Sequence, residues 1–279
     1  MGSLWMLLAS LAFAGMGVFA KLGAEHFSSA ELVFYRSVVG VVVLGTLARW
    51  RGWPLATAHW RLHLGRGVSG VVSLGLYFHC ISRLPLATAV TLNYTSPLFL
   101  ALISAVLLRE RLHRPLVTAV LVSFAGVLLL LEPTLQRDQM GDGALGLASG
   151  LLAAVAYANV KQLGADGEPS WRVVFYFTAL STVVAGLTIA LTGAHSVGLH
   201  NVWMLLGIGA TATVGQFAMT RAYHTARTLA AGALSYSTVV FSALLGLALW
   251  RERLGPEGWL GMALIIAGGL LSLRSGSRP

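Results

Sequence analysis

Runs of about twenty apolar residues recur along the whole chain, with only short polar links between them. A helix of about 20 apolar residues spans a bilayer core. By that measure the sequence holds ten candidate spans, at residues 4–22, 31–48, 65–82, 86–108, 115–131, 144–163, 171–192, 202–223, 228–250 and 257–273. Because hydrocarbon offers no partner to backbone polar groups, such runs fold as helices that satisfy their own hydrogen bonds. The pattern predicts an all-α integral membrane protein.

Composition agrees with this interpretation. Of the 279 residues, 56% are hydrophobic and only 10% are charged, whereas soluble domains carry about 25% charged residues. These values exclude a soluble enzyme, a disordered chain and a disulfide scaffold, and the single cysteine, Cys80, has no internal partner. The excess of 19 Lys and Arg over 10 Asp and Glu sits at span ends, so it indicates membrane orientation and no nucleic-acid partner.

The basic residues also predict the orientation. With the N-terminus inside the cell, 13 of the 19 Lys and Arg lie on the cytoplasmic side and 6 on the other. Cytoplasmic loops carry the excess of Lys and Arg. Both termini are therefore expected in the cytoplasm.

An internal repeat relates the two halves. Residues 82–131 align without gaps on 224–273, at an offset of 142, with 16 identities in 50 positions. The segment Arg109-Glu110-Arg111-Leu112 falls on Arg251-Glu252-Arg253-Leu254, and Tyr94 falls on Tyr236. Shared apolar composition does not explain charged residues in register after an apolar span.

Five spans in each copy make an odd number, so the second copy enters the membrane from the opposite side. We therefore expect two inverted five-helix repeats, at residues 1–135 and 143–279, joined by a linker at 136–142. Secondary transporters use such a pair to place a site near the bilayer midplane and to rock one half against the other.

The chain resembles the EamA family of the drug/metabolite transporter superfamily. The resemblance rests on Arg36 early in the second span, on Ser96-Pro97 in the fourth, and on Arg-Glu-Arg-Leu after the fourth and ninth spans. It implies a ten-helix carrier of the bacterial cell inner membrane that exports small metabolites, and within the family the chain looks most like the YddG-type amino-acid exporters. The second half departs from the pattern, because Val239 stands where Pro97 would repeat.

Several polar or aromatic residues fall within the spans, where each needs a partner or a wet cavity. The pairs Asn93-Tyr94 and Ser235-Tyr236 recur in both halves, which favours a cavity role over packing alone. The predicted substrate-binding residues are His79, Asn93, Tyr94, Tyr157, Asn159, Gln216, Ser235 and Tyr236. For His79, Asn159 and Gln216 a helix-end or interhelical hydrogen bond is an equal alternative.

Three residues are candidates for a hinge or gate. Pro97 removes a helix hydrogen bond in mid-span, and either a static kink or a hinge follows from that. Glu110 and Glu252 close pseudo-equivalent spans between arginines, where local pairing is the simpler account. For Arg36, snorkelling to the headgroups is preferred over an anion-attracting role.

All ten acidic residues lie at span ends or in links, so an acidic proton relay or sodium site is poorly supported. No metal-ligand spacing, phosphate loop or nucleophile motif occurs, and we expect neither metal nor cofactor nor enzymatic activity. His79 remains the candidate for proton coupling, with uncoupled movement as the alternative.

The sequence therefore predicts a secondary transporter that exports small amphipathic metabolites, aromatic or apolar amino acids first, by alternating access. Its partners are then the substrate and the lipid bilayer; the oligomeric state stays open, and a monomer fits. Alternatives are a carrier of sugars, nucleotides or cationic drugs, or a membrane scaffold or enzyme. Nucleotide carriage would want basic residues deep in the cavity, and the sequence places them at span ends.

Overall fold

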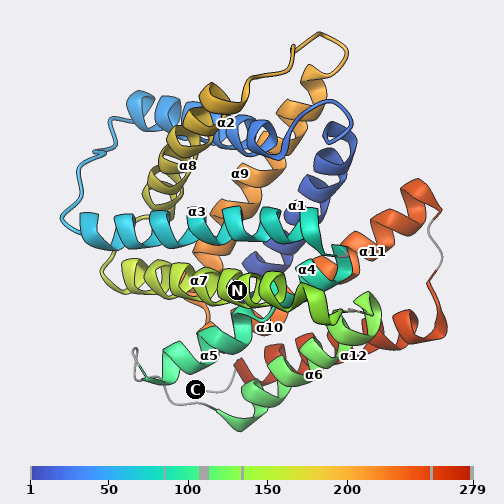
Figure 1. The fold of residues 1–279 in the computed structure, drawn as a ribbon. Coiled ribbons are helices and arrows are strands. Elements are labelled where there is room, and N and C mark those ends of the chain that lie inside the picture. The colour runs from blue at the N-terminus through green and yellow to red at the C-terminus, as the bar shows by residue number, and fades with distance from the viewer. Residues whose placement is uncertain (1, 85, 107–112, 133–134, 252–253, 277–279) are drawn as a thin grey trace.

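The computed structural model describes residues 2–84, 86–106, 113–132, 135–251 and 254–276, and all regular structure in these ranges is helical (Figure 1). The elements are α1 Gly2–Gly23, α2 Ser29–Trp50, α3 Trp60–Arg83, α4 Leu86–Asn93, α5 Ser96–Val106, α6 Arg114–Leu131, the 3-10 helix η1 Arg137–Gln139, α7 Met140–Ala165, α8 Ser170–Thr192, α9 Val202–Thr225, α10 Thr228–Ser235, α11 Ser237–Trp250 and α12 Pro256–Gly276.

The predicted spans are confirmed, with α4 and α5 together forming the fourth and α10 and α11 the ninth. Nine of the ten are long and apolar enough to cross a membrane, counted over the described residues. The exception is α3, which starts earlier than the apolar pattern indicates and carries Arg61, His63 and Arg66 in its first two turns. Of the predicted linker, η1 covers Arg137–Gln139, and the last three residues, 140–142, belong to the first turn of α7.

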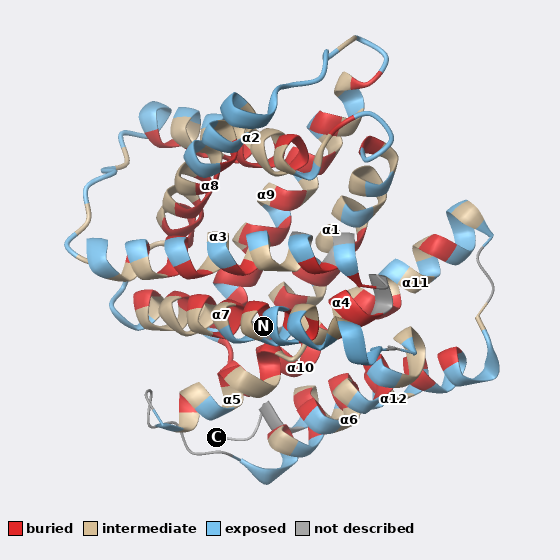
Figure 2. Cartoon of the chain, in the orientation of Figure 1, coloured by how far each residue is buried: buried red, intermediate tan, exposed pale blue. Residues whose placement is uncertain are grey.

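Burial follows the pattern of a chain in lipid (Figure 2). Large apolar side chains such as Leu102, Val106 and Leu187 are exposed on the outside of the bundle. Buried polar side chains such as Arg66 and Gln216 lie between helices. This arrangement suits a hydrocarbon surround, where polar groups need partners inside the protein.

The packing of α6 against α12 shows that the two halves are inverted. A Cβ on Gly126 would lie 2.5 Å from the carbonyl oxygen of Gly261, and one on Gly268 would lie 2.7 Å from that of Ala119. The offset of 142 converts the first contact into the second, with the two helices exchanged. Numbers rise along one helix as they fall along the other, so the equivalent helices pack antiparallel (Figure 1).

The remaining helices follow the same symmetry. The equivalent helices α2 and α8 pack together, and α1 packs on α9 as α3 packs on α7 (Figure 1). Along α3 and α7, Ser73 contacts Ser149 while His79 contacts Asp142, which is again an antiparallel order. Two inverted five-helix repeats are therefore the architecture.

Helices four and nine are both interrupted at the repeated tyrosines. The first break covers Tyr94 and Thr95, between α4 and α5, and the second is at Tyr236, between α10 and α11. Pro97 lies one position into α5, just past the first break, and is buried. The second break forms without a proline, so proline alone does not cause the interruption.

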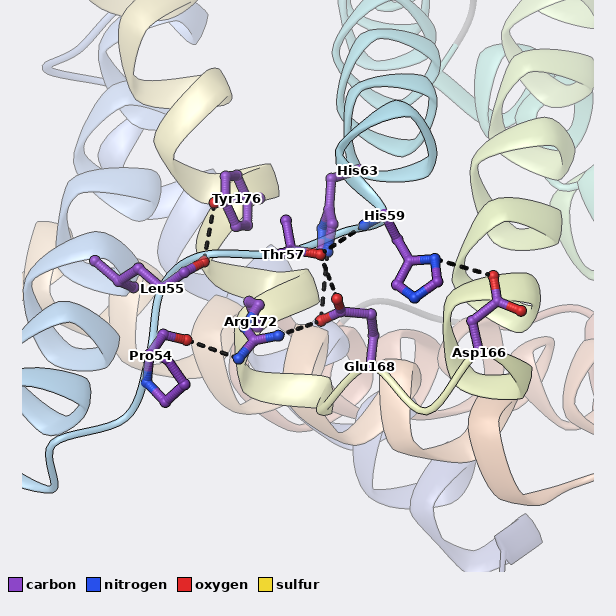
Figure 3. Close-up of polar contacts among 9 residues, drawn as sticks. All are labelled: Pro54, Leu55, Thr57, His59, His63, Asp166, Glu168, Arg172 and Tyr176. Atoms are coloured by element: carbon purple, nitrogen blue, oxygen red, sulfur yellow. Dashed lines mark hydrogen bonds and ion pairs between the residues drawn. The ribbon is translucent and has the colours of Figure 1, made fainter.

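A polar clasp ties the two halves at one face (Figure 3). Glu168, just before α8, accepts hydrogen bonds from the Thr57 hydroxyl of the α2–α3 loop and from Arg172 Nη1 at 2.9 Å. Arg172 Nη2 also donates to the Pro54 carbonyl at 2.7 Å, and Tyr176 donates to the Leu55 carbonyl at 3.0 Å. The loop is thus fixed to the start of α8.

A related clasp lies at the opposite face. Glu31, near the start of α2, accepts the backbone N–H of His195 at 2.6 Å, and His195 Nδ1 lies 2.7 Å from its other oxygen. His195 belongs to the α8–α9 loop, which the repeat relates to the α2–α3 loop. Both ends of the α2–α8 pair are therefore held by contacts between the halves.

We expect Gly126→Ala to lower the free energy of unfolding by about 1–3 kcal/mol, the usual cost of overpacking. The added methyl meets the backbone of Gly261 rather than a flexible side chain. Gly75→Ala on α3 is the control, since nothing lies within 4 Å of its Cβ position. Thermal unfolding in detergent measures both; equal stability of the two variants contradicts the close α6–α12 crossing.

Removing the Glu168 charge should weaken the first clasp. Burial opposes ionisation of Glu168, but hydrogen bonds from Thr57 and Arg172 and nearby positive charge outweigh it and lower its pKa. A carboxyl whose pKa is lowered by folding stabilises the protein above its unfolded pKa of about 4.3 and stops doing so as pH falls through the folded value.

Glu168→Gln should therefore destabilise the protein at pH 7 by about 1–3 kcal/mol. The difference from the parent should shrink on acidification below about pH 4. Unfolding midpoints measured across this pH range test the claim, with exposed Asp138→Asn as control. A gap between Glu168→Gln and parent that stays constant with pH would show that the charge is not what the clasp uses.

Candidate functional site

A cavity of about 740 Å³ lies between the two halves. Helices from both repeats line it, with Met6, Phe13 and Met16 from α1, Arg36 from α2, Tyr77 from α3, Tyr157 from α7, and Gln216, Met219 and Tyr223 from α9. A smaller recess of about 140 Å³ adjoins it, sharing Arg36, Tyr77, Asn93, Tyr157 and Gln216 and adding Arg66 and Ser73. The site is therefore amphipathic and central.

Both helix breaks open into this cavity. Asn93, Tyr94 and Ser96 line it from the first break, and Ser235 and Thr238 line it from the second. The rings of Tyr94 and Tyr236 lie 6.0 Å apart between centroids. An interrupted helix leaves polar groups free in mid-membrane, which is where transporters place their binding sites.

Two arginines reach the recess, and sequence reasoning misplaced both. Arg36 and Arg66 are 9% and 3% exposed, so Arg36 does not snorkel to headgroups and Arg66 does not lie at a span end. Arg66 lies in the second turn of α3, because that helix begins five residues before the predicted span. The expectation that no basic residue lies deep in the cavity is wrong.

Arg66 is held by neutral groups. Its Nη2 donates to Gln216 Oε1 at 3.2 Å, and its guanidinium lies 3.9 Å from the centroid of the Phe177 ring. A Cβ at Gly70 would lie 2.3 Å from Arg66 Nη1. The Arg66 side chain runs along α3 over Gly70, and the missing Cβ of this glycine leaves room for the guanidinium.

Five of the predicted binding residues line the cavity: Asn93, Tyr94, Tyr157, Gln216 and Ser235. Tyr236 is fully buried behind Tyr94 and lies outside the lining. Asn159 is turned away, since its amide donates to the Val155 carbonyl at 3.0 Å and packs by Gly65. His79 is exposed and lies 3.0 Å from Asp142 at the end of α3, so the structure does not bring it to the cavity.

Of the three hinge and gate candidates, the structure describes only Pro97. Glu110 and Glu252 lie outside the described residues. Pro97 packs against α10, where a Cβ on Gly232 would lie 3.3 Å from the proline Cβ. It therefore touches the other half of the protein beside the break.

The cavity is closed at one end. Toward the end marked by Met6, Leu163 and Tyr223, here called the Met6 end, buried side chains of α1, α5, α7, α9 and α10 form one apolar cluster. The Tyr157 and Tyr223 rings stack at 5.2 Å within it. At the opposite end, here called the Lys21 end, the lining runs out to Lys21, Leu131 and Leu254.

The two ends differ because equivalent helix pairs pack differently. Among the described residues, α7 packs against α9 and α10 against α5 and α6, whereas their equivalents, α1 with α3 and α4 with α11 and α12, hardly touch. Ser242 lines the open cavity; its equivalent at the offset of 142, Leu100, is outside the lining and is 1% exposed in the apolar cluster at the Met6 end.

The described lining contains no Asp or Glu, and the described residues hold no group of three or more His, Cys, Asp or Glu side chains arranged to bind a metal. The arrangement can bind a small molecule through guanidinium, amide and hydroxyl groups and pack its apolar part on tyrosine, methionine and phenylalanine. Sequence reasoning missed Tyr77 and Tyr223, because the offset of 142 relates them to Met219 and Ile81 and the repeat therefore gives no signal for either tyrosine.

Comparisons with known proteins agree with the fold. The EamA-like transporter family model matches residues 1–132 and 143–274. The pseudopaline exporter CntI of Pseudomonas aeruginosa is 34% identical over 271 residues, which cover 97% of this chain and 92% of that protein.

More distant relatives include an uncharacterized transporter of Helicobacter pylori, 28% identical over 95% of this chain and 92% of its own, and a riboflavin transporter of Vibrio cholerae, 26% identical over 95% and 90%. A solved crystal structure superposes with a TM-score of 0.88 at 19% identity, covering 99% of this chain and 97% of the other, which shows the fold. These relatives are named as an exporter and as transporters. This chain is a multi-pass membrane transporter of small metabolites and belongs to the EamA-like transporter family.

Proposed function

We propose that this transporter exports small amphipathic metabolites of the amino-acid type across the bacterial inner membrane by alternating access. The observation that carries the proposal is a central cavity between inverted halves, sealed at the Met6 end and open at the Lys21 end. In the predicted orientation the Lys21 end faces away from the cytoplasm. The structure then corresponds to the state that releases substrate.

The two halves, residues 1–135 and 143–279, exchange roles in this mechanism. Closing α1 on α3, as α7 now closes on α9, seals the Lys21 end, and the loss of the α7–α9 contact opens the Met6 end. The internal repeat makes both states nearly equal in their contacts. The helix breaks at Tyr94 and Tyr236 are where each half bends, with Pro97 beside the first.

Cavity side chains from both halves of the protein contact the substrate. Asn93, Gln216 and Ser235 offer hydrogen bonds to ammonium and carboxylate groups, and Tyr94 and Tyr157 offer rings and hydroxyls. Aromatic and apolar amino acids are the first substrates to test. A carrier of cationic drugs is disfavoured, because the lining bears Lys21, Arg36 and Arg66 and no described acid.

A second candidate is a larger conjugated metabolite with an aromatic ring system. The volume of about 740 Å³ and the aromatic lining favour it, and relatives named as riboflavin transporters point the same way.

Purified protein in liposomes should accelerate the exchange of labelled phenylalanine or tryptophan across the membrane. Tyr94→Ala should lower the rate several-fold, because the ring forms part of the central lining, whereas exposed Leu187→Ala on the lipid side should not. If no amino acid is moved or competes with a moved substrate, the amino-acid assignment fails.

Alternating access predicts reciprocal labelling of Leu100 and Ser242, which the repeat relates. Leu100 is 1% exposed at the closed end, and Ser242 lines the open cavity. In a chain carrying Cys80→Ala, Ser242→Cys should react with an impermeant maleimide from the Lys21 side, and Leu100→Cys only from the opposite side when the carrier turns over. Reaction of both from one side contradicts the exchange.

A further inference from the structure

The two buried arginines of the recess have no acidic partner in the part of the chain that the structure describes. Among the described residues, neither Arg36 nor Arg66 forms an ion pair. Arg66 Nε is buried without a hydrogen-bond partner, and the hydrogen bond of Nη2 goes to a neutral amide. Burying an unpaired charge is costly, so a fold that retains two such charges in one place uses them for binding.

The arginines reach the same depth from opposite ends of the molecule. Arg36 is the eighth residue of α2, and Arg66 is the seventh of α3. At about 1.5 Å per residue, each lies about 10 Å inside its helix end. Neighbouring consecutive spans run in opposite directions, so the two guanidiniums meet near the middle of the membrane, where both line the recess.

A further cation lies at the mouth of the cavity. At the helix breaks, the starts of α5 and α11 and the ends of α4 and α10 all adjoin lining residues, so their opposite partial charges offset one another. Lys21 stands at the open end, over the Trp250 ring at 4.1 Å. The cavity therefore has one basic side chain, Lys21, at its open end and two, Arg36 and Arg66, in the recess.

We infer that the recess of Arg36 and Arg66 selects a substrate of net negative charge that bears two or more carboxylates. This inference rests on the proposed transport function. A planar guanidinium binds a planar carboxylate through two parallel hydrogen bonds, and two arginines from different helices provide for two such groups. The apolar wall of Phe13, Met16 and Tyr77 takes the rest of the molecule.

Probes that share a phenyl ring and differ in charge test the selectivity. Phenylsuccinate carries two carboxylates, phenylalanine is a zwitterion and phenylalaninamide is a cation. In proteoliposomes, phenylsuccinate should inhibit or exchange with an apparent affinity at least tenfold better than phenylalanine, and phenylalaninamide should be the weakest. Phenyl phosphate is the fourth probe; if it outcompetes phenylsuccinate, the site reads phosphate and the carboxylate assignment is overturned.

Substitutions identify the groups responsible. Arg36→Gln and Arg66→Gln should each weaken phenylsuccinate about tenfold, the loss of one charge-assisted pair, and leave phenylalaninamide no worse. Gly70→Ala should act in the same direction as Arg66→Gln, since the methyl would meet Arg66 Nη1. Arg61→Gln, on the exposed side of the same helix, is the control and should change nothing.

Stability separates binding from structure. Without substrate, the Arg36→Gln and Arg66→Gln proteins should melt in detergent at or above the parent temperature, because each loses an unpaired buried charge. Phenylsuccinate should raise the melting temperature of the parent and not of the variants. Lower melting of both variants without substrate would assign the arginines a structural role and overturn the inference.

Failure of this inference can be told from failure of the proposed function. If phenylalanine moves and phenylsuccinate does not, transport stands and the anion selectivity falls. If no probe moves and none shifts the melting temperature, both fall.

Discussion

The structure depends on one constraint: inside a bilayer, every polar group must find its partner within the protein. That requirement makes the chain helical, turns its apolar side chains outward, and gathers its polar ones between the halves. Glycines allow the helices to approach closely enough for this, as at Gly126 and Gly261, where a methyl would meet backbone oxygen. The cavity is the place where the constraint is relaxed, because water and substrate can supply partners there.

Inversion of the repeat turns this packing into a mechanism. Helix pairs that the repeat relates pack tightly at the Met6 end and stand apart at the Lys21 end, so one repeated pattern appears in two conformations within one molecule. The α2–α8 pair is held by clasps at both faces, through Glu168 and Glu31. These fixed contacts lie at the side of the cavity, and the helix breaks at Tyr94 and Tyr236 lie at its centre. A firm frame and interruptible helices are what rocking between two states requires.

Sequence reasoning located the membrane spans and five of the residues that line the cavity. Asn93, Tyr94 and Ser235 were found because the repeat placed equivalent polar residues in mid-span, and they do line the cavity. His79 and Asn159 were misplaced because depth along a helix does not reveal the direction in which a side chain points. Arg66 was missed because the first turns of α3 contain Arg61 and His63, and an apolar count begins the helix too late.

Membrane insertion, ten spans and two inverted halves followed from the sequence alone, since hydropathy and an odd repeat number fix them without knowledge of any contact. The tertiary structure alone decided which end is open, which polar residues share the cavity, and that two arginines lie buried there with no Asp or Glu among the described lining residues. These depend on helix rotation and on contacts between residues such as Arg66 and Gln216, 150 positions apart. Nothing in the linear pattern encodes the angle at which two helices face each other.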